Sequence, residues 1–147
     1  MDTSAFDIAL RFSGLKETPG AVHNPQVMAM LKLDQAWPPG DETPWCSAFV
    51  SYVAWLLDLP RSKRLSARSW LKVGNPIMLE DARPGFDIVV LNRGGSSDPA
   101  APGPGHVGFF AGIDQDGSLL LLGGNQGDRV CVATFAAGLV LGVRRLA

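Results

Sequence analysis

"GHVGFFAGIDQDGSLLLLGGN", residues Gly105–Asn125, decides the fold that we expect for this chain. Two apolar segments rich in β-forming residues flank the turn "DQDG", and the Asp-Gly pair is a strong signal for a β-hairpin. With the turn centred on "QD", Ile113 pairs with Ser118 and His106 pairs with Asn125. Directly opposed residues point to the same side of a sheet, with Cβ atoms about 5 Å apart. The hairpin therefore predicts that an asparagine side chain lies against the imidazole of His106.

Three further segments have the pattern of strands. They are "DIVVL", which begins at Asp87, "RVCVATF" and "LVLGVRR", each short, β-rich and bounded by turn residues. The sequence thus predicts about five strands. Between "DIVVL" and "HVGFFAGI" lies "NRGGSSDPAAPGPG", residues Asn92–Gly105, which is too rich in glycine and proline for a regular element. Such a loop is either the rim or lid of a site or a tolerated insertion, and the sequence leaves both open.

The first part of the chain carries helical patterns instead. Residues Asp2–Phe12 have apolar side chains at helical spacing, and a short helix is also expected over "SARSWLKVG". Asn24 before Pro25, and Thr43 before Pro44, have the composition of N-caps that open two longer helices. Helices first and strands afterwards predict an α+β domain, with N-terminal helices packed on a mainly antiparallel sheet.

The composition is that of one ordinary globular domain spanning residues 1–147. Hydrophobic residues make up 46% and charged residues 18%, and the formal net charge of −1 argues against nucleic acid or an anionic membrane as a partner. The stretch "MDTSAFDIALRFSGLKE" lacks the features of a secretory signal, and no segment is apolar for long enough to span a bilayer. We therefore expect a chain that is cytoplasmic as synthesised. Its two cysteines, Cys46 and Cys131, are expected to be free thiols.

Cys46 lies at the start of the expected helix in "ETPWCSAFVSYVAWLLDL", directly after a proline and a tryptophan. Unpaired backbone N–H groups and the macrodipole favour negative charge at a helix N-terminus. Because this dipole and a nearby imidazolium lower the pKa of a thiol, we expect Cys46 to be a thiolate at neutral pH. The backbone N–H of Cys46 or Ser47 is a candidate oxyanion donor.

Cysteine, histidine and a side-chain amide together form a known type of catalytic arrangement. Cys46 attacks a carbonyl carbon, His106 accepts and returns the proton, and Asn125 orients the imidazole through its carbonyl oxygen. Taken singly, each residue has a structural interpretation: Cys46 as a buried apolar side chain, His106 as a satisfied histidine at a sheet edge, and Asn125 as a turn residue. The combination favours catalysis.

The segments "PWCSAFV", "RPGFDIVVL", "GHVGFFAG" and "GGNQGDRV" resemble, in this order, the CHAP and NlpC-type cysteine peptidases. These are a papain-like superfamily of bacterial and phage cell-wall hydrolases. "ETPGAVHNPQV" is also similar to the opening of one subgroup of small proteins in that superfamily, so the resemblance covers most of the chain. It implies a papain-like fold and hydrolysis of an amide bond in peptidoglycan, with Cys46 as nucleophile, His106 as base and Asn125 as orienting residue.

Two positions depart from the family pattern. Many CHAP members carry an acidic residue in the strand after the histidine, where "LLLLGGN" has glycine. Gln126 is therefore the alternative to Asn125 as the residue that orients His106. The segment "RPGFDIVV" has Phe86 where "PGD" is usual in the family, although Asp87 still precedes the strand.

Trp45 and Ser47 flank the nucleophile, and together with Gln126 they are the expected substrate-binding residues. No cofactor is expected, and no metal site, because the cysteines and histidines include no closely spaced pair of ligands. The expected partner is a peptidoglycan peptide, with an immunity or secretion protein as a further one.

Two other functions stay open at this point. An acyl- or peptidyl-transferase would use the same site, with an amine in place of water. A catalytically silent binding or structural module of a phage or secretion particle would keep the fold but have no catalytic activity. Without a signal peptide, delivery to the cell wall would depend on phage lysis or on a secretion system.

Overall fold

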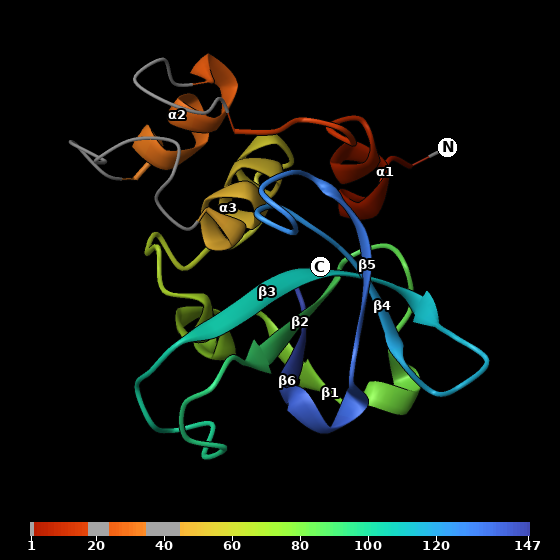
Figure 1. Ribbon diagram of the computed structural model, residues 1–147. Coiled ribbons are helices and arrows are strands. Elements are labelled where there is room, and N and C mark those ends of the chain that lie inside the picture. The colour runs from red at the N-terminus through yellow and green to blue at the C-terminus, as the bar shows by residue number, and fades with distance from the viewer. Residues whose placement is uncertain (1, 18–23, 35–44) are drawn as a thin grey trace.

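The computed structural model describes residues 2–17, 24–34 and 45–147, and within them the strands form one open antiparallel sheet under a layer of helices (Figure 1). The described part holds six strands, in the order β1-β6-β2-β3-β4-β5. Their bounds are Asn75–Ile77 (β1), Asp87–Asn92 (β2), Gly105–Ile113 (β3), Leu119–Gly123 (β4), Cys131–Phe135 (β5) and Val140–Arg145 (β6). The predicted α+β class is confirmed.

The strand that the sequence did not predict is β1, at the edge of the sheet. It has three residues, one of them Pro76, and pairs with the end of β6 through Ile77 and Val143. Proline donates no hydrogen bond and is tolerated only at such an edge. A segment this short has no alternation to detect, so only the tertiary structure reveals it.

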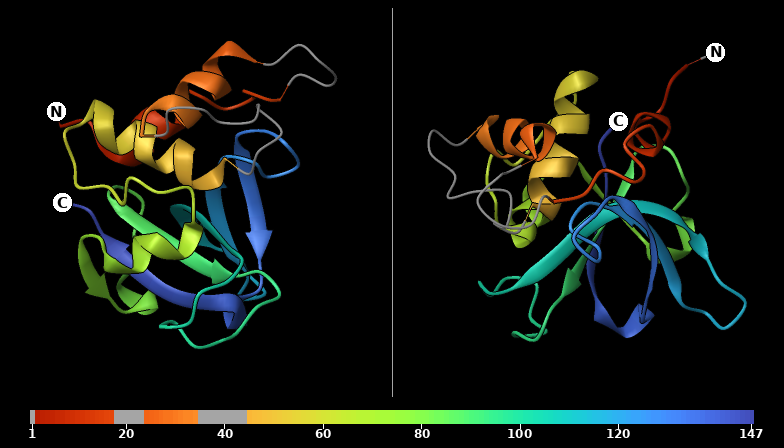
Figure 2. Two further views of the ribbon diagram at one scale, coloured as in Figure 1. Left: turned by 90° about the vertical axis from the view of Figure 1, so that its left-hand side faces the viewer. Right: turned by 45° about the horizontal axis from the view of Figure 1, so that its top comes forward.

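The three α-helices of the described residues lie on one side of the sheet (Figure 2). They are α1 (Ala5–Leu10), α2 (Pro25–Lys32) and α3 (Cys46–Leu56), and the short 3₁₀ helices are η1 (Ala67–Lys72), η2 (Leu79–Asp81) and η3 (Ala137–Leu139). None of the helices in these ranges has the length and apolar character needed to cross a bilayer. Ser4 closes a capping box with Asp7, and the predicted cap at Asn24 is confirmed.

The start of α3 differs from the prediction. The helix begins at Cys46, with Trp45 as an N-cap that makes no side-chain capping bond. Thr43 and Pro44, the predicted start, lie outside the described residues. Cys46 is therefore the first residue of the helix, where its own N–H has no intrahelical partner.

Both faces of the sheet are covered, and its strands bury side chains on each face. Ile88, Val90 and Val107 join the core between helices and sheet. Val89 and Leu91 join a second, smaller cluster on the opposite face. This explains why β2 is an uninterrupted apolar run instead of an alternating one.

The β3–β4 hairpin has the predicted register in its middle and a different one at its turn. Phe109 pairs with Leu122, as expected, but Ile113 pairs with Leu119 instead of Ser118. A bulge between Phe110 and Gly112 restores the register. The β3–β4 pairing ends before it reaches His106, because β4 ends at Gly123.

The long loop between β2 and β3 is fixed by Arg68 of η1, whose side chain is only 6% exposed. Its guanidinium N–H groups donate to five oxygens at 2.8 to 3.3 Å: the side-chain oxygen of Asn92 and the backbone oxygens of Ser96, Asp98, Ala101 and Pro104. One cation thus organises a segment whose sequence predicts no regular element.

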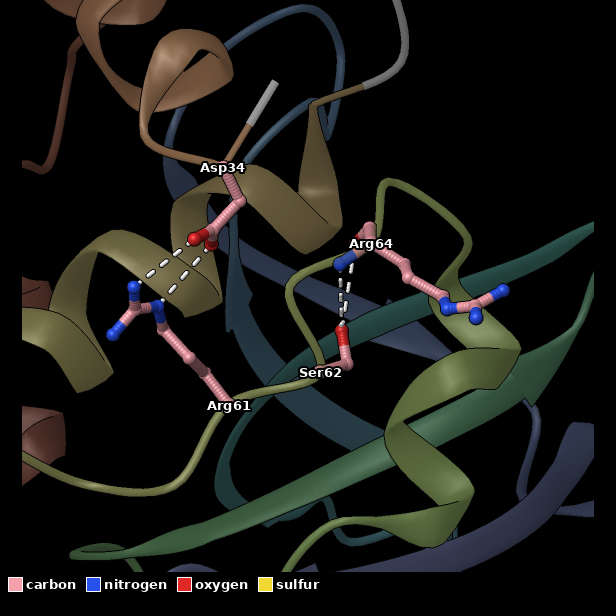
Figure 3. Close-up of polar contacts among 4 residues, drawn as sticks. All are labelled: Asp34, Arg61, Ser62 and Arg64. Carbon is pink, nitrogen blue, oxygen red and sulfur yellow. Dashed lines mark hydrogen bonds and ion pairs between the residues drawn. The ribbon is translucent and has the colours of Figure 1, made fainter. Parts of the chain in front are cut away.

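Two ion pairs within the described ranges tie together elements distant in sequence. Buried Asp87, at the start of β2, pairs with Arg145 of β6 at 2.7 Å. Asp34, after α2, holds Arg61, after α3, through two nitrogens (Figure 3). Asp87 therefore anchors the sheet, and the segment after α3 is fixed to α2.

Candidate active site

Cys46 lies at the N-terminus of α3 with 4% of its surface exposed. Burial raises the pKa of its thiol above the ordinary value, while the backbone N–H groups of Val107, Ser47 and Cys46 and the charge of Arg93 act in the opposite direction and are outweighed. Taken together, these effects favour the neutral thiol over the predicted thiolate in the free protein. The helix N-terminus supplies the expected donors, but desolvation, which depends on the packed structure, has the larger effect.

His106 lies on β3, is 5% exposed, and has the side chain of Gln126 as its polar partner. The two residues are joined by a hydrogen bond of 2.8 Å between the imidazole Nε2 and the amide Oε1. The imidazole is also stacked on the ring of Phe135, with centroids 5.2 Å apart. The hydrogen bond holds the edge of the ring, and the stacking on Phe135 holds its face.

The orientation of the Gln126 amide determines which imidazole nitrogen carries the proton. Its Nε2 donates to the backbone oxygens of Leu121 at 3.1 Å and Cys131 at 2.7 Å, so its Oε1 faces the imidazole. A carbonyl oxygen only accepts, which makes Nε2 of His106 the protonated nitrogen. The neutral ring then presents an unprotonated Nδ1, the form a general base requires.

The charge state of His106 agrees with this tautomer. Burial lowers its pKa, the hydrogen bond that the ring donates to Gln126 raises it by less, and Arg93 lowers it further. In the free protein the two candidate catalytic residues are therefore a neutral thiol and a neutral imidazole.

Cys46 and His106 belong to adjacent parts of one site. The thiol of Cys46 lies within reach of the backbone N–H of Val107, the residue that follows His106, and Arg93 acts on the pKa of both. Among the described residues no hydrogen bond joins the Cys46 sulfur to the imidazole. The fold thus brings the helix start against the strand that carries the histidine.

Asn125 does not take the position that strand pairing predicts. It lies in the turn after β4 with φ of 58°, a left-handed conformation that asparagine tolerates, and no hydrogen bond of the described residues joins it to His106. The predicted strand pairing of Asn125 with His106 is therefore not formed, since the chain leaves the sheet two residues earlier.

Gly123 explains how Gln126 reaches the histidine. A Cβ at position 123 would collide with Oε1 of Gln126 and would lie 3.4 Å from Nε2 of His106. The amide of Gln126 thus fills the space that a side chain on β4 would occupy. Gly123, within "LLLLGGN", is therefore the sequence signal for the room that Gln126 occupies.

Trp45 and Ser47 were predicted to bind substrate, and the structure gives them other contacts. Both are fully buried. The indole of Trp45 donates to Glu17 at 2.8 Å, a contact that the sequence did not reveal. The hydroxyl of Ser47 donates to the backbone oxygen of Arg64 and accepts from the indole of Trp70. Both side chains thus pack around the start of α3, and neither lines the pocket beside His106.

A pocket of about 480 Å³ opens beside His106. Asn125 and Gln126 also line it, whereas Cys46 does not. The pocket has an apolar wall, cations at Arg93 and Arg129, and no aspartate or glutamate among the described residues that line it. The arrangement suits a ligand that combines apolar parts with carboxylates.

Among the described residues, no group of three or more histidine, cysteine, aspartate or glutamate side chains could hold a metal ion, and His23 lies outside them. No protein-family model matches the chain, and a search of the curated proteins also finds no match. The functional assignment therefore depends on the geometry and on the residues that form it.

Proposed function

We propose that this chain is a papain-like, cysteine-dependent hydrolase that cleaves an amide bond in peptidoglycan, in the stem peptide or a cross-link. In this proposal Cys46 is the nucleophile, His106 the general base and Gln126 the residue that orients the imidazole. The wall would be reached through phage lysis or a secretion system, with an immunity or secretion partner. The resemblance in sequence to CHAP and NlpC-type peptidases motivates the substrate.

The observation that carries the proposal is the hydrogen bond from His106 to Gln126. It supports the Nε2–H tautomer and leaves Nδ1 as the basic nitrogen. With Nε2 engaged by Gln126, Nδ1 is the ring nitrogen that remains to accept the proton of the Cys46 thiol in this proposal.

The reaction begins from the neutral pair. As the Cys46 sulfur attacks the carbonyl carbon, its proton moves to Nδ1 of His106, and the N–H groups of Cys46 and Ser47, which have no partner within α3, stabilise the oxyanion. The C–N bond then breaks, and the imidazolium returns the proton to the leaving amine. Water then attacks the thioester and gives a proton to His106, which passes it to the departing Cys46 sulfur as the acid is released.

Incubation of the wild type with purified peptidoglycan, followed by mass analysis of soluble fragments, tests the proposal. Cys46→Ala removes the nucleophile, and Cys131→Ala is the matched control because it removes the other thiol. We expect fragments with new amino and carboxyl ends from the wild type and from Cys131→Ala only. Fragments from Cys46→Ala, or from no protein on several wall types, would refute the hydrolase. Adducts of an added amine would identify a transferase, and binding without cleavage a silent module.

A further inference from the structure

A second cavity, of about 560 Å³, lies between η1, the segment before it and the loop that Arg68 fixes. The charged residues in its lining are all basic: Arg61, Arg64, Arg68 and Lys72. Three serines contribute hydroxyl groups, and Leu71, Val73 and the 99–102 segment form an apolar side. This concentration of positive charge is unexpected in a chain whose formal net charge is −1.

Arg68 gives the cavity a buried charge that no carboxylate of the described residues pairs with. All five of its hydrogen bonds go to neutral oxygens, so the guanidinium is solvated by the protein but its charge is not cancelled. The carboxylate of Asp98 caps the backbone N–H of Ala100 instead. A buried cation without a counter-ion is costly, and an anion in the adjacent cavity would reduce this cost.

Arg64 and Lys72 are the cations in this lining that remain available for a ligand. Both are exposed, and neither side chain forms a hydrogen bond or ion pair with another described residue. The carboxylate of Asp34 is paired with Arg61. Figure 3 shows the Arg64 side chain extending away from this pair.

We propose that this cavity binds a small oxyanion, a carboxylate or phosphate group, held by Arg64 and Lys72 in front of the buried charge of Arg68. Arginine offers a planar fork that matches either group, and lysine adds a point charge. The apolar side next to the cations accommodates a short apolar portion of the same ligand. The site is separate from the proposed hydrolase site and does not depend on it.

The test is titration of the full chain, at constant ionic strength, with inorganic phosphate in one arm and N-acetylalanine in the other. The methylamide of N-acetylalanine, which lacks the carboxylate, is the ligand control. Binding is followed by calorimetry and by the backbone amide signals of residues 66–72 and 100–101. The two arms distinguish a phosphate site from a carboxylate site.

The double variant Arg64→Ala/Lys72→Ala should weaken binding of the preferred anion about tenfold or more. Arg11→Ala/Lys32→Ala is the matched control, because it removes the same charge from exposed positions that do not line the cavity, and it should bind like the wild type. A thermal melt of each variant verifies folding. No binding in either arm, equal weakening by both double variants, or signal changes confined to the pocket beside His106 would overturn the proposal.

Discussion

The side-chain amide of Gln126 holds Nε2 of His106 at 2.8 Å, although Asn125 is the residue that an uninterrupted hairpin would place opposite this histidine. The difference arises because β4 ends at Gly123. The turn that follows brings the side chain of Gln126 back against this glycine. The orienting group therefore comes from a turn that Gln126 itself stabilises, through its bonds to Leu121 and Cys131.

Gln126→Ala should lower kcat/KM about a hundredfold, because the imidazole loses the acceptor that selects its tautomer. Asn125→Ala should cause a smaller loss, since Asn125 has no hydrogen bond to His106. Steady-state kinetics on a peptidoglycan peptide, with circular dichroism to verify folding, measure both. A larger loss of activity in Asn125→Ala than in Gln126→Ala would show that Asn125, and not Gln126, orients the imidazole.

The imidazole of His106 should titrate below its ordinary pKa of about 6.5, because burial disfavours the charged ring. The neutral base then persists into mildly acidic solution, so kcat/KM should rise with pH through a midpoint below that value. An NMR titration of the ring protons gives the pKa directly, and ¹⁵N shifts identify the protonated nitrogen. A midpoint above 6.5, or a proton on Nδ1, would be incompatible with this environment.

Iodoacetamide should label Cys131 before Cys46 at neutral pH. Cys131 is partly exposed, whereas burial both shields Cys46 and raises its pKa, which leaves little thiolate to react. Peptide mapping by mass spectrometry after timed quenching should show Cys46 modified about tenfold more slowly or more, with a rate that increases into alkaline solution. Unfolding in urea should remove the difference, and faster labelling of Cys46 in the folded protein would contradict its burial.

Local patterns predict the elements but not the environments of the site residues. Helices before strands, the cap at Asn24 and the middle of the β3–β4 register follow from spacing and turn chemistry. The neutral state of Cys46 does not, because desolvation depends on packing against β3. The choice of Gln126 over Asn125 depends on where a strand ends, and strand ends carry the weakest sequence signal.

Gly123→Ala should impair catalysis by displacing Gln126 from His106. The added Cβ would meet Oε1 of Gln126, the end of a flexible side chain that can move away and release His106. We expect kcat/KM to fall about tenfold or more, and the melting temperature to fall as well, because a displaced Gln126 also loses its bonds to Leu121 and Cys131. Gly138→Ala is the control, because its Cβ meets no atom within 4 Å. Equal kinetics for the two variants would show that Gln126 keeps its contact in another way.

Arg68→Lys should loosen the loop between β2 and β3 even though the charge is conserved. A lysine has three N–H donors on one atom and cannot reach five oxygens spread from Asn92 to Pro104. Unsatisfied buried oxygens should cost about 1–3 kcal/mol of the free energy of unfolding. Hydrogen exchange should accelerate at the backbone amides of the loop and remain unchanged in α1. Arg11→Lys makes the same exchange at an exposed position and should leave the loop protected, so similar exchange rates in the two variants would show that Arg68 does not fix it.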